Sequence, residues 1–160
     1  MNAPSPDRRR RRLLVAWGLF VAFSGVVLFL GGARFDAAET SGILAPLLQW
    51  LFPDWSASDR YLLHLKVRKS AHLIEYAVLG LLALRATFVT FQTAIARIAA
   101  VALLLAAAVA TTDEARQAFL ENRTGSWRDV VLDVTGAGAA VGLALLLRRL
   151  RRSRSAGAPP

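Results

Sequence analysis

The sequence contains no cysteine, which excludes disulfide bonds and thiolate metal sites. It has few acidic side chains, 11 Asp and Glu against 20 Lys and Arg, and its formal net charge is therefore +9. The body of the chain lacks that excess, because residues 13–147 hold ten basic and ten acidic side chains. A nucleic-acid-binding protein arrays basic charge over a folded face, so we expect no nucleic-acid partner.

The basic charge lies instead in two runs of five arginines. One run is Arg8–Arg12, and the other is Arg148, Arg149, Arg151, Arg152 and Arg154. Each run flanks an apolar segment in a 160-residue chain that is 55% hydrophobic, against roughly 45–50% for soluble domains. Arginine beside apolar segments is how membrane proteins mark their cytoplasmic ends. The sequence therefore predicts a membrane protein and argues against a soluble globular domain.

Four segments are long and apolar enough to cross a bilayer, which takes roughly 20 residues of helix. They are residues 13–30, 71–89, 95–112 and 130–147. The first could be a signal peptide because it follows basic residues, but no clear small-residue cleavage site follows it. We therefore interpret it as a retained anchor and predict an all-α, polytopic membrane protein with four transmembrane helices.

An even number of spans places both termini on one side of the membrane, and the two arginine runs predict that this side is cytoplasmic. The predicted organisation is a basic cytoplasmic tail over residues 1–12, a four-helix transmembrane domain over residues 13–147, and a second basic cytoplasmic tail over residues 148–160. On this topology, residues 31–70 and 113–129 lie outside.

Two further features concern packing. The apolar stretch over residues 43–53 contains two prolines and is too short to span, so it could be an interfacial or re-entrant helix, or a hydrophobic loop packed on the bundle. In the fourth span, Gly138-x-x-x-Gly142 has the small-residue spacing that lets membrane helices approach closely. This face could support a homo-oligomer.

Polar side chains recur at helical spacing at the outer ends of the last three spans. They are Lys69, His72, Glu75 and Tyr76 in the second span, Asp113, Glu114 and Gln117 after the third, and Asp129 and Asp133 in the fourth. A charge at a membrane helix centre costs at least about 2.5–3.5 kcal/mol on insertion scales. We therefore expect these stripes to converge a turn or two below the outer surface and to face one another or a water-filled cleft. A network that merely holds the helices together is the alternative.

The residue types in these stripes permit several kinds of chemistry. Imidazole and carboxylate groups could bind a divalent metal, but no H-E-x-x-H pattern is present, so a metal is not favoured and the cofactor stays unknown. His72 beside a carboxylate could act as a general base. Lys69, Arg123 and Arg128 near the same mouth would suit a phosphate or carboxylate group, although a solvated rim of charge is the plainer interpretation of Arg128.

Two segments carry a resemblance to a known family. Arg68-Lys69-x-x-His72-x-x-Glu75-Tyr76-x-x-x-Gly80 resembles the first signature of the VanZ-like family. A second segment of this chain resembles the second signature of the same family. It reads Asp113-Glu114-x-x-Gln117-x-Phe119 followed by Asn122-Arg123-x-Gly125-Ser126-x-x-Asp129-Val130-x-x-Asp133-x-x-Gly136. The resemblance covers about residues 60–147 and departs at Glu121-Asn122, where family members often have proline and glycine.

The resemblance implies a small multi-pass protein of the bacterial cytoplasmic membrane. The family's namesake is linked to resistance to teicoplanin, a glycopeptide whose target is the lipid-linked cell-wall precursor. The resemblance implies no established reaction, so the assignment as an enzyme stays open.

Two hypotheses of function follow. In the first, the outward-facing site binds an anionic envelope lipid or lipid-linked cell-wall precursor, with Lys69 and Arg123 on the anion. Tyr76 and Gln117 would be hydrogen-bond partners, and Glu75, Asp129 and Asp133 would orient the cations and line the pocket. Asp113 and Glu114 complete the predicted substrate-binding set. In the second, the protein is a membrane-embedded hydrolase or transferase that uses His72 with Glu75 or Asp133. Proton-coupled transport through the Glu75 and Asp133 pair is a weaker third hypothesis.

Overall fold

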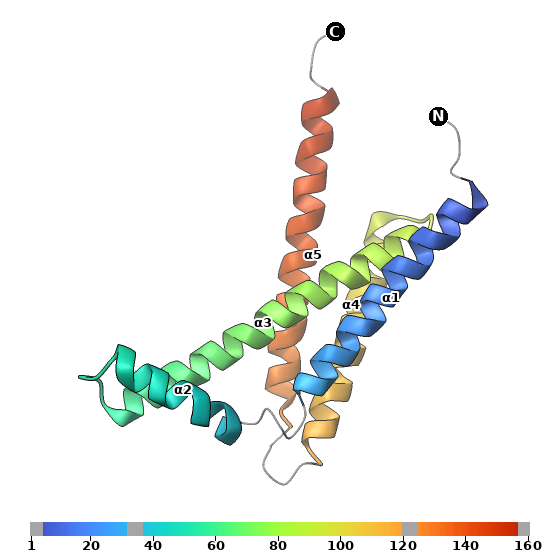
Figure 1. Ribbon diagram of the computed structural model, residues 1–160. Helices are drawn as coiled ribbons and strands as arrows, with labels where there is room; N and C mark the ends of the chain where they lie inside the picture. The colour runs from blue at the N-terminus through green and yellow to red at the C-terminus, as the bar shows by residue number, and fades with distance from the viewer. Residues whose placement is uncertain (1–4, 32–36, 120–124, 157–160) are drawn as a thin grey trace.

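The computed structural model describes residues 5–31, 37–119 and 125–156, and within these ranges the chain forms five α-helices and no strand. The helices are α1 (Pro6–Leu30), α2 (Ala37–Leu51), α3 (Ala57–Thr90), α4 (Ile95–Gln117) and α5 (Trp127–Ala156) (Figure 1). The predicted all-α fold is confirmed.

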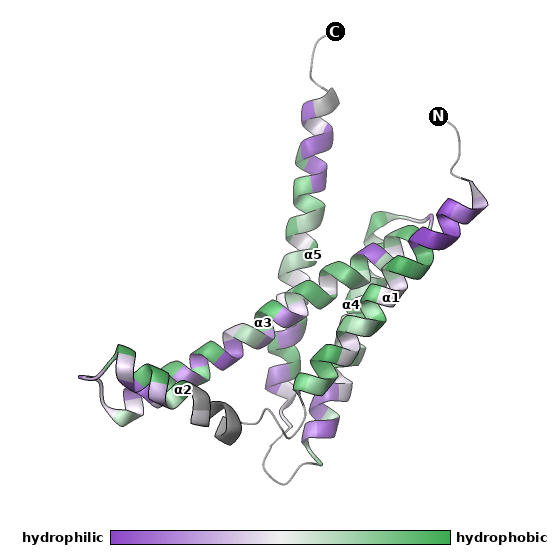
Figure 2. Ribbon diagram, in the orientation of Figure 1, coloured by the Kyte–Doolittle hydropathy of each residue, from purple (hydrophilic) through white to green (hydrophobic). Residues whose placement is uncertain are grey.

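Four of these helices, α1, α3, α4 and α5, are long and apolar enough to cross a membrane. Each contains one predicted span, so the prediction of four transmembrane helices is confirmed. Hydrophobic residues cover α1 beyond its first turns and the middle of α5, and hydrophilic residues gather at the start of α1 and at both ends of α5 (Figure 2). Helix α2, with 15 residues, is not among the spanning candidates.

Several helices extend beyond the apolar segments that predicted them. Helix α1 begins at Pro6 and α5 runs to Ala156, so both arginine runs are helical. Helix α3 begins at Ala57, where Ser56 caps it by accepting a hydrogen bond from the backbone N–H of Asp59 at 3.1 Å. The apolar segment that begins near residue 71 thus lies inside a longer helix, because apolarity marks where a helix enters lipid and not where its backbone hydrogen bonding begins.

Helix α3 organises the bundle, since it contacts each of the other four helices and has its most extensive contact with α5. The α3–α5 contact is close because two glycines lie in it. A Cβ at Gly80 would lie 2.9 Å from the Cα of Ala137, and one at Gly136 would lie 2.6 Å from the carbonyl oxygen of Leu73. Both distances are shorter than real Cβ contacts, so backbone approaches backbone at these positions.

The pair Gly138 and Gly142 does not make this close approach. A Cβ at either position would meet nothing within 4 Å in the described part of the chain. Within one chain, the close helix approach is therefore made by Gly80 and Gly136 and not by this pair, because spacing does not show which way a helix turns. Self-association through Gly138 and Gly142 stays a prediction.

The start of α1 and the end of α5 point toward the same end of the bundle, at the top of the view, and diverge from each other there (Figure 1). The indole Nε1 of Trp17 donates a 2.9 Å hydrogen bond to Thr90 Oγ1, and the guanidinium of Arg148 lies 4.1 Å from the ring centroid of Phe88. Both partners belong to the last turns of α3. The two arginine runs therefore lie at the same end, as four spans require, while the side of the membrane they face stays a prediction.

The short apolar stretch over residues 43–53 belongs mostly to α2, which folds back on the first half of α3 to form a helical hairpin. Leu48 is buried in this contact. Arg60 holds the turn, because its Nη1 donates to the carbonyl oxygens of Phe52, Pro53 and Trp55. The structure thus supports a helix over a loop, and its position relative to the membrane surface stays a prediction.

Candidate polar site at one end of the bundle

The second-span stripe runs from the surface of α3 into the bundle. Lys69 is exposed, while the side chain of His72 is 24% exposed and Glu75 is half-buried. Tyr76 is completely buried. Residues three or four apart lie on one helix face, so a single stripe carries polar groups from solvent to the helix interface.

Helix α4 contributes three buried polar side chains near its end, Asp113, Glu114 and Gln117. Gln117 Nε2 donates a 2.8 Å hydrogen bond to Asp113 Oδ2. The amide predicted to contact a ligand therefore positions a carboxylate.

Arg116 connects this carboxylate to α1. Its Nη1 lies 3.7 Å from Asp113 Oδ1 and donates a 2.7 Å hydrogen bond to the carbonyl oxygen of Leu28. At Gly31, directly after α1, a Cβ would overlap the Asp113 carboxylate. The backbone at the end of α1 therefore packs directly against the Asp113 carboxylate, and position 31 has room only for glycine.

Glu114 fixes the entry to α5. Its Oε2 accepts a 2.7 Å hydrogen bond from the backbone N–H of Ser126. Gly125 packs so closely on α4 that a Cβ there would clash with the carbonyl oxygen of Glu114. The described part of the second-signature turn is therefore held on α4 by backbone contacts that suit glycine and serine.

Asp133 on α5 faces the α3 stripe, and its side chain is 1% exposed. His72 Nδ1 lies 3.9 Å from Asp133 Oδ1. Neither Asp133 oxygen nor the Tyr76 hydroxyl has a hydrogen-bond partner among the described residues. Buried polar atoms are normally paired with protein or ordered water, so this pair of orphaned groups is the most unusual feature of the cluster.

The acidic groups of all three helices act on one another. Tyr76 lies within electrostatic range of Asp133, Asp113, Glu114 and Glu75. Asp129, one turn before Asp133, also acts on that carboxylate and is half-buried. The structure thus brings together the stripes of α3, α4 and α5, as their spacing predicted, in a region rich in carboxylates.

The described cations predicted to bind an anion are exposed, unlike the buried acidic side chains of Asp113, Glu114 and Asp133. Lys69 is at the exposed start of the α3 stripe, and Arg128 is exposed with its guanidinium 5.8 Å from the ring centroid of Trp127. Arg123, predicted to contact an anion, lies outside the described residues. Within the described ranges, no group of three or more His, Cys, Asp or Glu side chains is arranged to hold a metal ion.

Sequence reasoning assigned no role to Arg116, Gly31 or the Ser126 backbone. Arg116 could have been found from its place three residues after Asp113, which puts both side chains on one helix face. The contacts of Gly31 and Ser126 join segments distant in the chain, and local spacing carries no such signal.

Comparison with known proteins identifies the chain at the level of its family. Neither the curated proteins nor the solved structures contain a match for it. The family model of VanZ/LLP1 matches residues 13–148, which include the four predicted spans and the whole polar cluster. The chain belongs to the VanZ/LLP1 family.

Proposed function

We propose that this VanZ/LLP1 membrane protein binds the polar head group of an anionic envelope lipid or lipid-linked cell-wall precursor. The observation that carries the proposal is that the buried polar groups of Asp133 and Tyr76 have no hydrogen-bond partner among the described residues, beside the partly exposed His72. A head group that supplies hydroxyl or amide groups would give the carboxylate donors and the phenol an acceptor. His72 is the partly exposed polar group that leads from the surface toward these two side chains.

The anion itself would be held at the rim of the site. Lys69 is exposed at the start of the α3 stripe, and Arg123, which lies outside the described residues, is its proposed cationic partner from the sequence alone. A cation at the rim keeps its hydration when no ligand is present, whereas a buried one would need a permanent partner. The inner acids then select the uncharged part of the head group.

The site is proposed to face away from the cytoplasm. The arginine runs lie at the opposite end of the bundle, and clusters of Lys and Arg favour the cytoplasmic side. In a bacterial inner membrane, the polar site would then open where envelope precursors are exposed. A role in teicoplanin resistance would follow from binding the precursor that the antibiotic targets.

The test is native mass spectrometry of the purified full-length protein with a lipid-linked cell-wall precursor. Asp133→Asn and Lys69→Ala should each reduce the bound fraction by about tenfold or more, the usual value of one hydrogen bond to a charged group. Arg149→Ala removes a positive charge at the opposite end of the bundle and is the matched control. Equal binding by all four proteins would contradict the proposal.

Resistance is tested separately in a susceptible bacterium that expresses the chain. The wild type should raise the teicoplanin concentration needed to stop growth, and Asp133→Asn should not. Precursor binding without any change in this concentration would keep the binding site and remove the resistance role.

A second candidate function is a hydrolase or transferase that acts on the same lipid-linked substrate. The observation that favours it is the 3.9 Å approach of His72 Nδ1 to Asp133 Oδ1, since a carboxylate beside an imidazole can orient it as a general base. His72→Ala should then slow product formation by about 10²–10⁴-fold, while Arg149→Ala should leave the rate unchanged. A precursor that is bound but never converted would leave the binding function alone.

A further inference from the structure

A cavity lies between α2 and the first turns of α3, outside the polar cluster formed by the stripes of α3, α4 and α5. It is partly open, has a volume of about 290 Å³ and is lined by residues of both helices of the hairpin. Leu48 and two alanines form its apolar wall, and its polar side chains are Gln49, Arg60, Tyr61 and His64. The mechanism proposed for the polar cluster uses none of them.

His64 is the unusual member of this lining. It is only 4% exposed, and its Nε2 has no hydrogen-bond partner among the described residues. Its ring packs edge-on against Tyr61, with centroids 6.5 Å apart and planes at 76°. Since a buried imidazole nitrogen normally has a partner, an unpaired one in the wall of a cavity points to a ligand.

The charge of the lining indicates what that ligand is. Every polar side chain in the wall can donate a hydrogen bond, and none of the described lining residues is acidic. Arg60 is held in place by its Nη1 bonds to the turn carbonyls. A fixed guanidinium among neutral donors matches a phosphate group.

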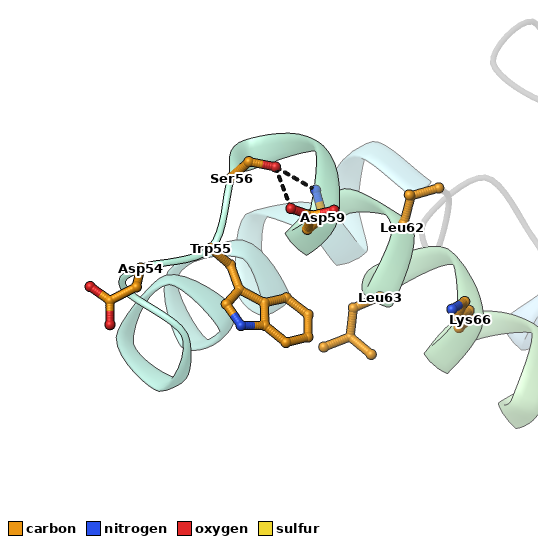
Figure 3. A pocket seen from close by; sticks show the side chains of 7 residues that line it. All are labelled: Asp54, Trp55, Ser56, Asp59, Leu62, Leu63 and Lys66. Atoms are coloured by element: carbon orange, nitrogen blue, oxygen red, sulfur yellow. Dashed lines mark hydrogen bonds between the residues drawn. The ribbon is translucent and has the colours of Figure 1, made fainter.

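The neighbouring cavity at the hairpin turn shows the contrast. It is lined by Asp54, Trp55, Ser56, Asp59, Leu62, Leu63 and Lys66, and Ser56 there bonds to Asp59 (Figure 3). Two carboxylates would repel an anion from that cavity. The selection for an anion is therefore specific to the cavity that contains His64.

The surroundings of the hairpin indicate where the phosphate comes from. Trp50 is 76% exposed, Trp55 44% and Leu62 54%. Exposed tryptophan is typical of the membrane–water interface, where one side of the ring meets lipid and the other meets water. Helix α3 continues from this hairpin into the membrane, so the hairpin is tied to the bilayer surface.

We propose that the cavity between α2 and α3 binds the phosphate of an anionic phospholipid, with Arg60 and His64 as its donors. This site lies on a different helix pair from the polar cluster and goes beyond the proposed function. It would fix the hairpin on the membrane surface beside the mouth of that cluster.

The experiment is native mass spectrometry of the full-length protein in detergent, titrated with phosphatidylglycerol, with phosphatidylcholine of the same chain length, or with inorganic phosphate alone. The wild type should retain phosphatidylglycerol in preference to phosphatidylcholine. His64→Leu should weaken this binding by about tenfold, the usual effect of losing one hydrogen bond to a charged group. His64→Gln keeps an N–H donor and should restore part of it.

Lys66→Gln is the matched control, because it removes a full positive charge on the same helix from outside the cavity. It should leave the preference for phosphatidylglycerol unchanged. Elution volume and helical content of each variant identify those that fail to fold, and His64→Gln then carries the test.

Several outcomes would overturn the proposal. One is equal retention of both phospholipids by the wild type, and another is unchanged retention in His64→Leu. Tight binding of inorganic phosphate without lipid would show that the cavity binds free phosphate and not a phospholipid. Loss of phosphatidylglycerol in Asp133→Asn but not in His64→Leu would assign the lipid to the polar cluster, so this proposal and the proposed function can fail separately.

Discussion

The two ends of the bundle differ in whether their charged side chains are buried or exposed. At the polar end, Asp113 and Asp133 are each 1% exposed and lie where three helices meet. At the other end, the arginines of α1 and of α5 are mostly exposed on helices that extend past the bundle. A charge taken out of water needs specific partners, whereas a solvated one does not. Helix packing and charge therefore depend on each other at the polar end only.

This difference gives the two ends different roles. The polar end combines close helix contacts, buried carboxylates and a partly exposed histidine, which are the ingredients of a selective site. We expect the arginine end to interact with lipid phosphates and water and to determine the orientation of the protein in the membrane. Substitutions at the polar end should therefore change stability and binding, and those at the arginine end should change topology with little effect on folding.

The largest effect is expected where α3 and α5 meet below the cluster. In Gly136→Val the new side chain would meet the backbone of Leu73, which cannot move aside cheaply, and we expect unfolding to become easier by about 3 kcal/mol, the upper part of the usual cost of overpacking. Gly25→Val is the matched control, because a Cβ there meets nothing within 4 Å. Thermal unfolding in detergent measures both, and equal losses would contradict the close approach.

A smaller effect is expected from separating Arg116 and Asp113. Arg116→Met would leave the Asp113 carboxylate without its guanidinium and free the Leu28 carbonyl oxygen. Removing one partner of a buried pair costs about 3–5 kcal/mol, and because Arg116 is 49% exposed we expect about 2 kcal/mol.

The double variant Arg116→Met with Asp113→Asn supplies the control for this pair. It removes the buried charge together with its partner and should recover about half of the lost stability. Denaturant unfolding of the four proteins gives the coupling free energy. If the two losses simply add, Arg116 and Asp113 do not stabilise each other.

The part of the fold that could be predicted from the sequence is the part that crosses the bilayer. Long apolar runs have one common solution in a bilayer, and the four spans follow from them. The hairpin of α2 with the start of α3 could not be located in the same way, because its helices are short or polar and depend on their contact with each other. Leu48 is apolar in the sequence, but only the fold shows that it packs on α3.

The polar site was predicted as a set of residues and not as a set of contacts. Helical spacing correctly placed His72 and Asp133 on facing stripes, since the period of a helix is fixed. It could not show that Gln117 binds Asp113 or that Gly136, and not Gly138, packs on α3. Those facts depend on how each helix is rotated about its axis, which single-helix spacing leaves undetermined.

An effect of opposite sign is expected at Asp133. Asp133→Asn removes a buried carboxylate whose oxygens have no hydrogen bond among the described residues, and burying a charge is costly unless it is paired and hydrogen-bonded. We expect a gain of about 1 kcal/mol with loss of precursor binding. Asp129→Asn, one turn earlier and half-buried, is the control and should change stability by less than about 0.5 kcal/mol. A loss of stability in Asp133→Asn would indicate that this carboxylate holds the helices together.

The last prediction concerns the side of the membrane on which the polar end and the arginine end lie. It needs substitutions with the smallest effect on folding, and it tests the difference between the two ends most directly. The chain has no cysteine, so one introduced cysteine is the sole target of a thiol reagent. Ser58→Cys near the start of α3 and Ser153→Cys near the end of α5 are both at exposed positions, where substitutions change stability by less than about 0.5 kcal/mol.

In intact bacterial cells with a permeabilised outer membrane, a maleimide that cannot cross the inner membrane should label Ser58→Cys and should reach Ser153→Cys only after that membrane is opened. We expect this result because runs of arginine favour the cytoplasmic side, which would place the ends of α1 and α5 inside and the start of α3 outside. Replacing both arginine runs with glutamine should weaken this asymmetry while the folded bundle keeps its thermal stability. Labelling of Ser153→Cys alone would place the polar cluster on the cytoplasmic side, where a site for outward-exposed envelope precursors could not work.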